Sequence, residues 1–504
     1  MRSIDAMARR MPLFAVPILL IAACTPGSGS TGPAPSATRV VEPLTLRVME
    51  FNVEYGGTGV DFDSIPKVIE ASGADIVAIE EGYGNMPAIA GSVGWYFDNR
   101  TQVMSRFPLL TPPDAEPFVY VEVAPASVVA VANVHLPSVA YGPFKIRDGA
   151  SAQEVLDVEA RKRVAALAPT LAAAERLAAD RVPVFLVGDF NAPSHLDWTE
   201  AAVGIRDHVR FPLGWPASVA VEEAGLVDSY REANPDPVAD PGLTWPADRP
   251  FVEGYNPFRA GAAADRIDFV YAGGPAATID SQLVGEEGGE GVDIAVTPWP
   301  TDHRATVSTF EVEPAPAPTI VSVDRQLVTV GEELVVRSHS SEDPVSIAIL
   351  PAGAGATDAT TNYLARGDEV TVPTATVRPG AYEVVLLSSS GDELARAPFW
   401  VQAAGGEPEV GTRRSAYSTG HPIVVTWRFA PGNRADWVGI YRRDADPDRA
   451  PYLLWAYTGG SVEGSAMFDA DAPGAWPLKP GAYTVYLLRD DSYVALASGD
   501  FRVE

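Results

Sequence analysis

The sequence predicts an α/β domain followed by an all-β tail. Up to about residue 312, apolar runs typical of buried strands alternate with helix-like segments, a pattern that favours α/β layers. Beyond Pro314 helical periodicity disappears, and short strand-like runs lie between Gly and Pro turns. A chain of 504 residues is also too long for a single hydrophobic core. We therefore expect several domains.

The helices of the α/β part are indicated by the residues that begin them. Asp63-Ser64-Ile65-Pro66 opens one helix, with the proline near the first turn. Ser151-Ala-Gln-Glu has capping-box spacing and begins a long Ala/Leu/Arg/Glu stretch that runs to about Asp180. Apolar runs expected to be buried strands separate or follow these helices. They are VVAVANVHL (128–136), VPVFLVGDF (182–190) and RIDFVYA (266–272). An α/β catalytic domain over residues 44–312 follows.

The tail contains an internal repeat. VRPGAYEVVLL (377–387) recurs as LKPGAYTVYLL (478–488). Two strand-rich repeats of this size, with frequent turn signals, predict two immunoglobulin-like β-sandwich modules over residues 319–403 and 407–504. Residues 313–318, which contain PAPAP, are expected to form a Pro-rich linker. The modules could bind cell wall, glycan or protein, or could act as a spacer.

Residues 1–24 have the pattern of an export signal peptide. A pair of arginines precedes an apolar stretch, Leu13 to Ala23, that is shorter than the roughly 20 residues of a membrane span. The stretch ends in Ile-Ala-Ala-Cys, which resembles a bacterial lipoprotein box whose cysteine is lipidated. Cys24 is the single cysteine of the chain, so no intramolecular disulfide can form. We expect an exported protein that is lipid-anchored at the outer face of a bacterial cell membrane, or secreted, with residues 25–43 as a flexible tether.

The composition is that of a globular, acidic protein. Hydrophobic residues make up 46% of the chain and charged residues 20%, which is ordinary for folded proteins. The 37 Lys and Arg residues are outnumbered by 66 Asp and Glu, giving a formal charge of −29. No basic run occurs beyond the N-terminus, which argues against affinity for polyanions through counterion release. The acidic charge favours solubility outside the cell.

Polar residues gather at the ends of the predicted strands, where α/β proteins carry their ligands and catalytic groups. Six short segments contain them. They are FNVEYGG (51–57), AIEEG (78–82), NVHLP (133–137), GDFNAPSHLDW (188–198), DRIDFVY (265–271) and TDHRATV (301–307). Hydrolysis of a phosphoester needs a divalent cation held by carboxylates, an activated water and groups that stabilise the developing charge. Together the six segments contain candidate residues for all three roles.

Four candidate residues lie in the segments FNVEYGG, AIEEG and GDFN. Glu81 ends the run ADIVAIE and is a candidate metal ligand. The Asn52 amide can bind the metal or orient a neighbouring carboxylate. Asp189 and Asn191 flank Phe190, so their side chains point the same way. The aspartate can accept a proton from water, and the asparagine can contact a phosphate oxygen.

Two histidines complete the set, His135 in NVHLP and His303 in TDHRATV. His303 could pair with a carboxylate such as Asp268 and present its other ring nitrogen to a phosphate. Taken singly, these positions have ordinary alternatives, since Asn52 could be a turn residue and His135 a structural histidine. With six histidines and no cysteine cluster, a His/Cys zinc site is not expected. A serine hydrolase is not expected either, because no G-x-S-x-G motif occurs.

In chain order these motifs resemble the endonuclease/exonuclease/phosphatase superfamily over roughly residues 44–312. The resemblance implies the deoxyribonuclease-I-like fold, a four-layered α/β sandwich with two β-sheets packed face to face and helices outside. The Gln-Glu motif of the superfamily falls on Glu80 and Glu81, so Glu80 stands where glutamine is usual. MSRFP (104–108) is similar to its Ser-Arg-aromatic-Pro element. Thr301 is a mild departure, since serine usually precedes the final aspartate.

The resemblance also implies a role for each position. Mg²⁺ or Mn²⁺ would polarise the phosphate while Asp189 activates the attacking water. His303, backed by Asp268, would stabilise the developing charge. The implied metal ligands are Glu81, Asn52 and Asp302, and the implied phosphate-holding or substrate-binding residues are His303, Asn191, His135 and Asn52.

The substrate is not determined by these motifs. The first expectation is an extracellular phosphodiesterase or nuclease. A lipid or small-molecule phosphoesterase, similar to sphingomyelinases or inositol phosphatases, is the alternative. A further alternative is a surface binding protein that acts mainly through its β-sandwich tail.

Overall fold

The structure is a computed structural model that describes residues 43–504, except 114–115, 258–262, 342–344, 357–361, 365–368 and 473. The predicted signal peptide with Cys24, and the tether up to residue 42, lie outside the described residues. Among the helices of the described part, none is both long and apolar enough to cross a membrane.

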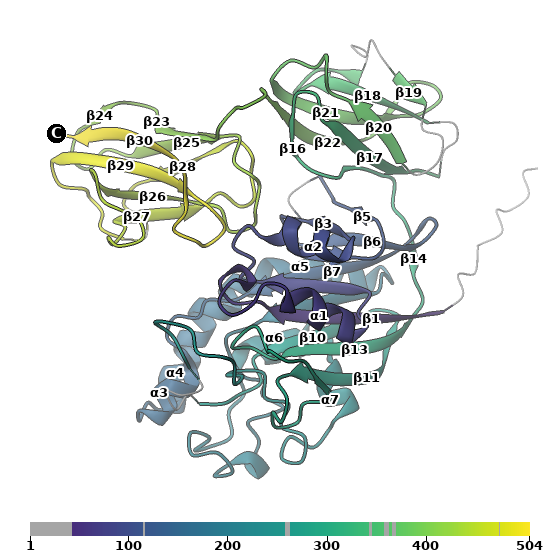
Figure 1. The fold of residues 1–504 in the computed structure, drawn as a ribbon, viewed down its shortest axis with the longest axis vertical. Coiled ribbons are helices and arrows are strands. Elements are labelled where there is room, and N and C mark those ends of the chain that lie inside the picture. The colour runs from purple at the N-terminus through teal and green to yellow at the C-terminus, as the bar shows by residue number, and fades with distance from the viewer. Residues whose placement is uncertain are drawn as a thin grey trace, which may run out of the picture. The chain divides into compact units, whose positions relative to one another are not determined.

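Two β-sheets form the framework of the α/β domain, residues 44–312 (Figure 1). Sheet A has the strand order β12-β11-β13-β1-β2-β4-β3. Its strands are β1 (Leu44–Asn52), β2 (Ile76–Glu80), β3 (Tyr96–Asp98), β4 (Val103–Ser105), β11 (Ala276–Gly285), β12 (Ile294–Ala295) and β13 (Ala305–Val312). Sheet B has the order β5-β6-β7-β8-β10-β9. Its strands are β5 (Leu109–Leu110), β6 (Val119–Ala124), β7 (Ser127–His135), β8 (Val184–Asp189), β9 (Val227–Asp228) and β10 (Asp268–Gly273).

Seven α-helices belong to the described residues of this domain. They are α1 (Ser64–Ser72), α2 (Met86–Val93), α3 (Gly142–Arg147), α4 (Ala152–Glu159), α5 (Ala165–Ala179), α6 (Pro216–Glu223) and α7 (Ser229–Ala233). The predicted capping box is present, because the Ser151 hydroxyl accepts from the Glu154 backbone and Glu154 accepts from Ser151 in return. A π-helical turn, Ala160–Val164, joins α4 to α5, so the predicted long helix is continuous to Ala179.

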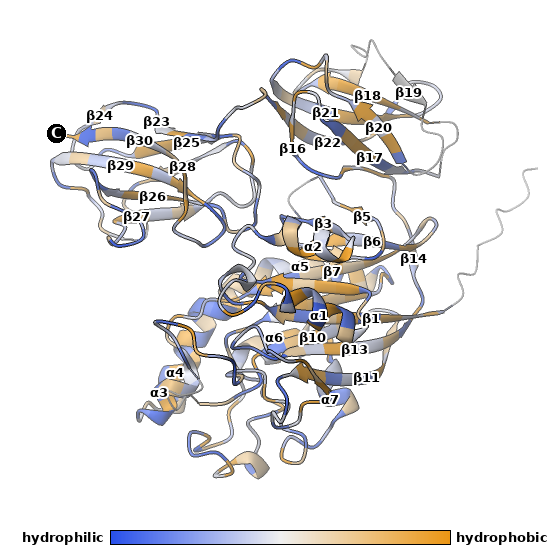
Figure 2. Cartoon of the chain, in the orientation of Figure 1, coloured by the Kyte–Doolittle hydropathy of each residue, from blue (hydrophilic) through white to orange (hydrophobic). Residues whose placement is uncertain are grey.

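Side chains of both sheets share a central core, which includes Val48 of β1 and Val187 of β8. The alternate residues of these strands point to the opposite face of each sheet, which is also apolar and packs on helices. Helices α1 and α2 pack on sheet A around Ile69, and α5 and α6 pack on sheet B around Leu171. Figure 2 shows the resulting hydrophobic colour along β7, a strand buried along its whole length except at His135.

The tail forms two strand-rich modules, here called module 1 (residues 319–403) and module 2 (residues 407–504). Module 1 contains β15 (Ile320–Val323), β16 (Leu327–Thr329), β17 (Glu333–His339), β18 (Ser346–Pro351), β19 (Asn362–Leu364), β20 (Glu369–Pro373), β21 (Gly380–Leu387) and β22 (Glu393–Gln402). Module 2 contains β23 (Glu409–Thr412), β24 (Ala416–Tyr417), β25 (Ile423–Arg428), β26 (Trp437–Arg442), β27 (Leu454–Tyr457), β28 (Gly464–Phe468), β29 (Gly481–Leu488) and β30 (Ala495–Val503).

Each module has a three-stranded and a five-stranded sheet that enclose one core. The strand orders are β15-β17-β20 with β16-β22-β21-β18-β19, and β23-β25-β28 with β24-β30-β29-β26-β27. Counted along the chain, the two orders are the same, so the sequence repeat is also a repeat of topology. The predicted sandwich core followed by a β-rich tail is confirmed.

The Pro-rich segment between the α/β domain and module 1 includes a short strand. Ala315-Pro316 forms the short strand β14, which pairs antiparallel with Val128 and Ser127 of β7. Proline lacks a backbone N–H donor, and this edge position does not require one. The segment expected to separate the domain from the tail therefore adds a strand to sheet B.

Candidate active site

Three neighbouring strands of sheet B bring one set of polar residues together. In the parallel pair β7–β8, His135 lies opposite Asp189, and in the antiparallel pair β8–β10, Asp268 lies opposite Asp189. The backbone of β8 comes unusually close to β7 at Gly188, where a Cβ atom would lie 1.9 Å from the Val134 carbonyl oxygen. Gly188 also has φ +134°, so glycine is required immediately before the aspartate.

Sheet A supplies the opposite half of the site. The parallel pair β1–β2 places Asn52 opposite Glu80, and Glu81 follows at the strand end. Strand β13 is antiparallel to β1, so the segment before it returns to the same edge. The Thr301 hydroxyl fixes this segment by donating to the Asn52 carbonyl oxygen at 2.9 Å. Asp302 and His303 are thereby brought to the ends of β1 and β2.

These side chains surround a cavity of about 270 Å³. Six of the eight predicted residues line it, namely Glu81, His135, Asp189, Asn191, Asp302 and His303. The other two, Asn52 and Asp268, are fully buried and contact the lining residues from behind. Tyrosines and Trp245 complete the wall, which gives the cavity an aromatic rim around its acidic centre.

His303 and Asp268 form the expected pair. The Nδ1 atom of His303 lies 3.0 Å from a carboxylate oxygen of Asp268, and Nε2 lies 3.9 Å from oxygens of both Asp189 and Asp302. Burial alone would lower the pKa of His303, but the charge and hydrogen bond of Asp268, with Asp302 and Asp189, raise it well above its ordinary value. The imidazole is therefore held in its charged form, with Nε2 directed into the cavity.

Asp189 is oriented by two donors. One carboxylate oxygen accepts from the Asn191 backbone at 2.7 Å, and the other accepts from the Asn52 amide at 3.1 Å. His135 Nε2 lies 3.6 Å away. Burial and the nearby Asp268 raise the pKa of Asp189 from 3.8 to about 6. Such a carboxylate is a better proton acceptor than an exposed one and is still ionised at neutral pH.

The profile of the Endonuclease/Exonuclease/phosphatase family matches residues 49–303, half of the chain, and spans every residue of this site. The chain belongs to the Endonuclease/Exonuclease/phosphatase family. Members of this family hydrolyse phosphoesters with the help of a divalent metal ion, so the chain is a phosphoester hydrolase.

Individual relatives match about half of the chain. An uncharacterized protein of Caenorhabditis elegans is 28% identical over 263 residues, which cover 46% of this chain and 79% of the relative. TDP2 of D. rerio, in complex with a single-strand DNA product, is 15% identical and covers 53% of this chain and 98% of its own, with a TM-score of 0.31. A mannosyl-6-phosphatase of Bacteroides thetaiotaomicron is 11% identical, with coverages of 53% and 99% and a TM-score of 0.31.

The donor set of the site fits the hard divalent cations that the family uses. Glu81 and Asp302 present carboxylates to the same cavity, and oxygen ligands are those that Mg²⁺ and Mn²⁺ prefer. Burial raises the pKa of Glu81, and the Asp302 charge adds to this effect. A bound cation would relieve that repulsion. Atoms of Asp189, Asp268 and His303 also lie within 4.8 Å of one another, but this group could hold an ion only with His303 in its neutral form.

The Asn52 amide is placed to orient carboxylates. Its Nδ2 lies 3.1 Å from Asp189 and 3.5 Å from Glu81, while its Oδ1 accepts from the Glu54 backbone at 3.1 Å. Of the two roles considered for this amide, the hydrogen-bond network favours the orienting one. The amide therefore orients the carboxylates of Asp189 and Glu81, which lie at strand ends of different sheets.

A buried ion pair beside the site was not predicted. Arg249 makes two hydrogen bonds of 2.6 Å to the Glu54 carboxylate, and Glu54 in turn accepts from the Asp302 backbone at 3.1 Å. Trp245 donates to the Asp302 carboxylate at 3.1 Å. These residues fix Asp302 in position. Glu54 stands inside the FNVEYGG motif, which was the available signal, whereas no local pattern points to Arg249.

The departure of this chain from the family at Glu80 has a physical explanation. The Glu80 side chain is buried, and its carboxyl group lies beside that of Glu50, a second buried glutamate whose pKa is also raised by burial. Burial raises the pKa of Glu80 to about 8; the hydrogen bond with Glu50 opposes this rise, and the charges of Asp268 and Asp189 add to it. The carboxyl is therefore mostly protonated at neutral pH. A protonated glutamate is uncharged, like the glutamine usual at this position.

Proposed function

We propose that this chain is an extracellular, metal-dependent phosphodiesterase that acts on nucleic acid or a related phosphodiester. One observation carries the proposal. Asp189 is buried between His135, the Asn52 amide and the His303–Asp268 pair, at the wall of a cavity that also holds Glu81 and Asp302. This arrangement combines a proton acceptor, a charged imidazole and a pair of metal-binding carboxylates within one site.

The roles we assign follow from the contacts. Asp189 accepts the proton of the attacking water, since its raised pKa lies close to neutral. His303, kept charged by Asp268, stabilises the charge that develops on the phosphate oxygens. Asn191 and His135 border the same cavity and hold the phosphate. The Asn191 amide is itself fixed, because it donates to the Leu136 carbonyl at 3.0 Å.

Glu81 and Asp302 would hold the divalent ion, with Asn52 as a further ligand or as the group that orients Glu81. The ion, Mg²⁺ or Mn²⁺, would supply Lewis-acid polarisation of the phosphate when bound. Trp245 and Glu54 keep the Asp302 side chain and backbone in place for this purpose.

The proposal includes the organisation and location of the whole protein. We propose a four-layered deoxyribonuclease-I-like catalytic domain with two immunoglobulin-like modules, exported and lipid-anchored through Cys24 at the outer face of a bacterial membrane, or secreted. The divisions are a signal peptide at 1–24, a tether at 25–43, the catalytic domain at 44–312, a Pro-rich segment at 313–318 and the modules at 319–403 and 407–504. Sequence patterns support the export signal and the module repeat.

The test is hydrolysis of a panel of phosphoesters by the full chain, with Mg²⁺, with Mn²⁺ and with EDTA. The panel contains plasmid DNA, RNA, bis-p-nitrophenyl phosphate, sphingomyelin and inositol phosphates. We expect metal-dependent cleavage of the diesters, lost in Asp189→Asn and retained in Asp63→Asn, an exposed aspartate matched as the control. Activity confined to sphingomyelin or inositol phosphates would replace the proposal with the lipid or small-molecule alternative. Diester cleavage by Asp189→Asn at the unaltered rate would show that the base is misassigned.

A further inference from the structure

A second cavity adjoins the metal-site cavity and is lined partly by module 2. It has a volume of about 340 Å³. Glu81, Tyr83 and His135 line both cavities, so the two lie on either side of the same three residues. Module 2 contributes Arg434 and Tyr457 to the second one. A substrate bound at the metal site would therefore extend toward residues of the tail.

Module 2 is held at this cavity by buried polar contacts. The Asp490 carboxylate, 2% exposed, accepts from Gln102 Nε2 at 2.9 Å and from the Gly84 backbone at 2.6 Å. The same carboxylate accepts from the Ala435 backbone at 3.2 Å, and the Arg434 backbone donates to the Asn99 carbonyl at 3.1 Å. The segment that carries Arg434 is thus bound to the α/β domain directly through its own backbone and indirectly through Asp490.

The guanidinium of Arg434 is available to a ligand. In the described part of the chain it takes part in no hydrogen bond or ion pair, although Glu80, Asp490 and Asp491 lie close enough to act on it electrostatically. Asp490 accepts from the donors named above, and Asp491 accepts from the Tyr457 hydroxyl at 2.6 Å. Arginine keeps its charge in proteins, and a partly buried cation without a partner favours an anion.

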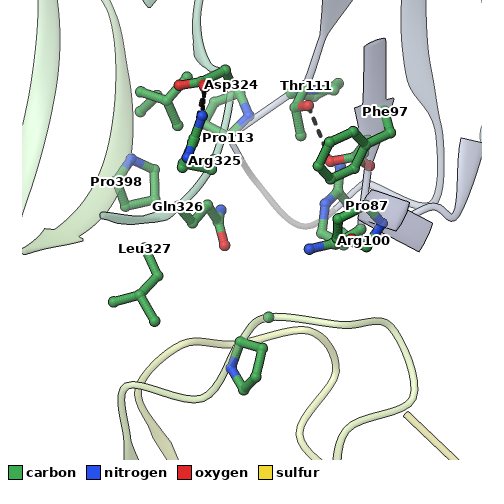
Figure 3. Close-up of a pocket in the computed structure, with 17 residues that line it drawn as sticks. Pro87, Phe97, Arg100, Thr111, Pro113, Asp324, Arg325, Gln326, Leu327 and Pro398 are labelled. Atoms are coloured by element: carbon green, nitrogen blue, oxygen red, sulfur yellow. Dashed lines mark hydrogen bonds and ion pairs between the residues drawn. The ribbon is translucent and has the colours of Figure 1, made fainter. Parts of the chain in front are cut away.

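A neighbouring cavity shows the contrast. It measures about 440 Å³ and is lined by residues of the α/β domain, module 1 and module 2, none of which belongs to the metal site (Figure 3). Its arginines are already engaged. Arg325 pairs with Asp324 at 3.0 Å, and Arg100 donates to the carbonyl oxygens of Glu116 and Phe118. We therefore assign the anion to the cavity at Arg434 and not to this one.

We propose that Arg434 forms a subsite for a second anionic group of the substrate, next to the scissile phosphate. The inference rests on the proposed function and makes the substrate class more specific, a phosphodiester that carries a further phosphate. Tyr83 and Tyr457 supply aromatic faces at the same cavity, and Tyr457 is 49% exposed. Aromatic faces bind flat rings by stacking, as single-stranded nucleic acid would offer. A small bisphosphate would offer the same second charge without the strand.

The experiment compares Arg434→Gln with Arg449→Gln in the full chain. Arg449 is also in module 2, but its side chain is 84% exposed. We measure kcat and KM on bis-p-nitrophenyl phosphate, which has one phosphate, on a thymidine trinucleotide and on an inositol bisphosphate. In Arg434→Gln we expect KM for the trinucleotide to rise about tenfold, the loss of one charge-assisted contact. With the single-phosphate diester, kcat and KM should stay within about twofold of the unaltered protein.

Equal effects on all substrates, or no effect on any, would overturn the subsite. A rise confined to the inositol bisphosphate would assign the second phosphate to a small molecule in place of a nucleic-acid strand.

Binding supplies a readout that does not need hydrolysis. Calorimetric titration with adenosine 3′,5′-bisphosphate should show about tenfold weaker binding in Arg434→Gln than in Arg449→Gln. Unchanged binding in Arg434→Gln would exclude the subsite even if the protein hydrolyses phosphoesters. Absence of hydrolysis by the unaltered protein, with binding still dependent on Arg434, would overturn the proposed function and leave the subsite standing.

Discussion

Replacing Asp189 with asparagine should stabilise the folded protein at neutral and alkaline pH while it removes hydrolysis. Asp189 is 1% exposed, and burial together with the charge of Asp268 raises its pKa from 3.8 to about 6. The folded state therefore tolerates the ionised carboxylate less well than the unfolded state does. An asparagine has nearly the same shape and does not ionise, so the variant avoids this cost.

The magnitude follows from linkage. A shift of about two pKa units, at roughly 1.4 kcal/mol per unit, corresponds to about 3 kcal/mol. Below pH 3.8 the carboxyl is protonated in both states and nothing is lost. Between pH 3.8 and about 6 the folded state keeps a proton that the unfolded state has released. Above about pH 6 the carboxyl is ionised in both states, and the unfolding free energy of the unaltered protein is then lower by the full amount of about 3 kcal/mol.

Asparagine also changes one hydrogen bond. The oxygen of Asp189 that accepts from the Asn52 amide becomes a nitrogen in the variant, which costs about 1 kcal/mol. The Asn191 backbone can still donate to the remaining oxygen. We expect a net gain of about 2 kcal/mol at pH 8, which disappears near pH 4.

The assay is urea unfolding followed by tryptophan fluorescence at several pH values, with EDTA to keep metal from the site. Asp63→Asn serves as the control for the exchange of an exposed aspartate and should follow the unaltered protein at every pH. If Asp189→Asn shows the same pH dependence as the unaltered protein, or is less stable at pH 8, burial does not perturb Asp189 as the structure indicates.

Three further predictions concern the metal, the backbone and the buried ion pair. EDTA should abolish hydrolysis, and Mg²⁺ or Mn²⁺ should restore it; full activity in EDTA would contradict metal dependence. Gly188→Ala should lose soluble expression, because its Cβ would meet a carbonyl of β7, whereas Gly91→Ala in α2, with nothing within 4 Å, should fold normally. Arg249→Lys should lower the unfolding free energy by about 2 kcal/mol and reduce activity, because lysine cannot make both hydrogen bonds to Glu54. Arg181→Lys, an exposed control, should change neither, and an equal loss in both variants would refute the role of the pair.

The polar strand ends could be predicted because the evidence for them is local. GDFN follows a continuous apolar run, so its polar side chains must lie where a buried strand ends. The expected pair of His303 with Asp268 is also present, because the segment before β13 of sheet A and the start of β10 of sheet B lie at the same end of the sandwich. The pairing of Arg249 with Glu54 joins residues 195 positions apart, and no periodicity or motif encodes such a contact. The sequence indicates residues 313–318 as a Pro-rich linker, and its composition gives no sign of the short strand that pairs with β7.

By itself the sequence determined the class of this protein. Carboxylates, amides and histidines at the ends of apolar runs, in a defined order, indicate a phosphoesterase, because residue type and strand periodicity are local properties. The tertiary structure decided the protonation states of the site residues and which remote residues lie beside them. It buries Asp189 and Glu80 between two sheets and so raises their pKa, it turns the Asn52 amide toward carboxylates, and it brings Arg434 of the tail beside the catalytic cavity. Burial and distances between remote segments exist only once the sheets have packed, and these quantities set the charges and contacts of the site.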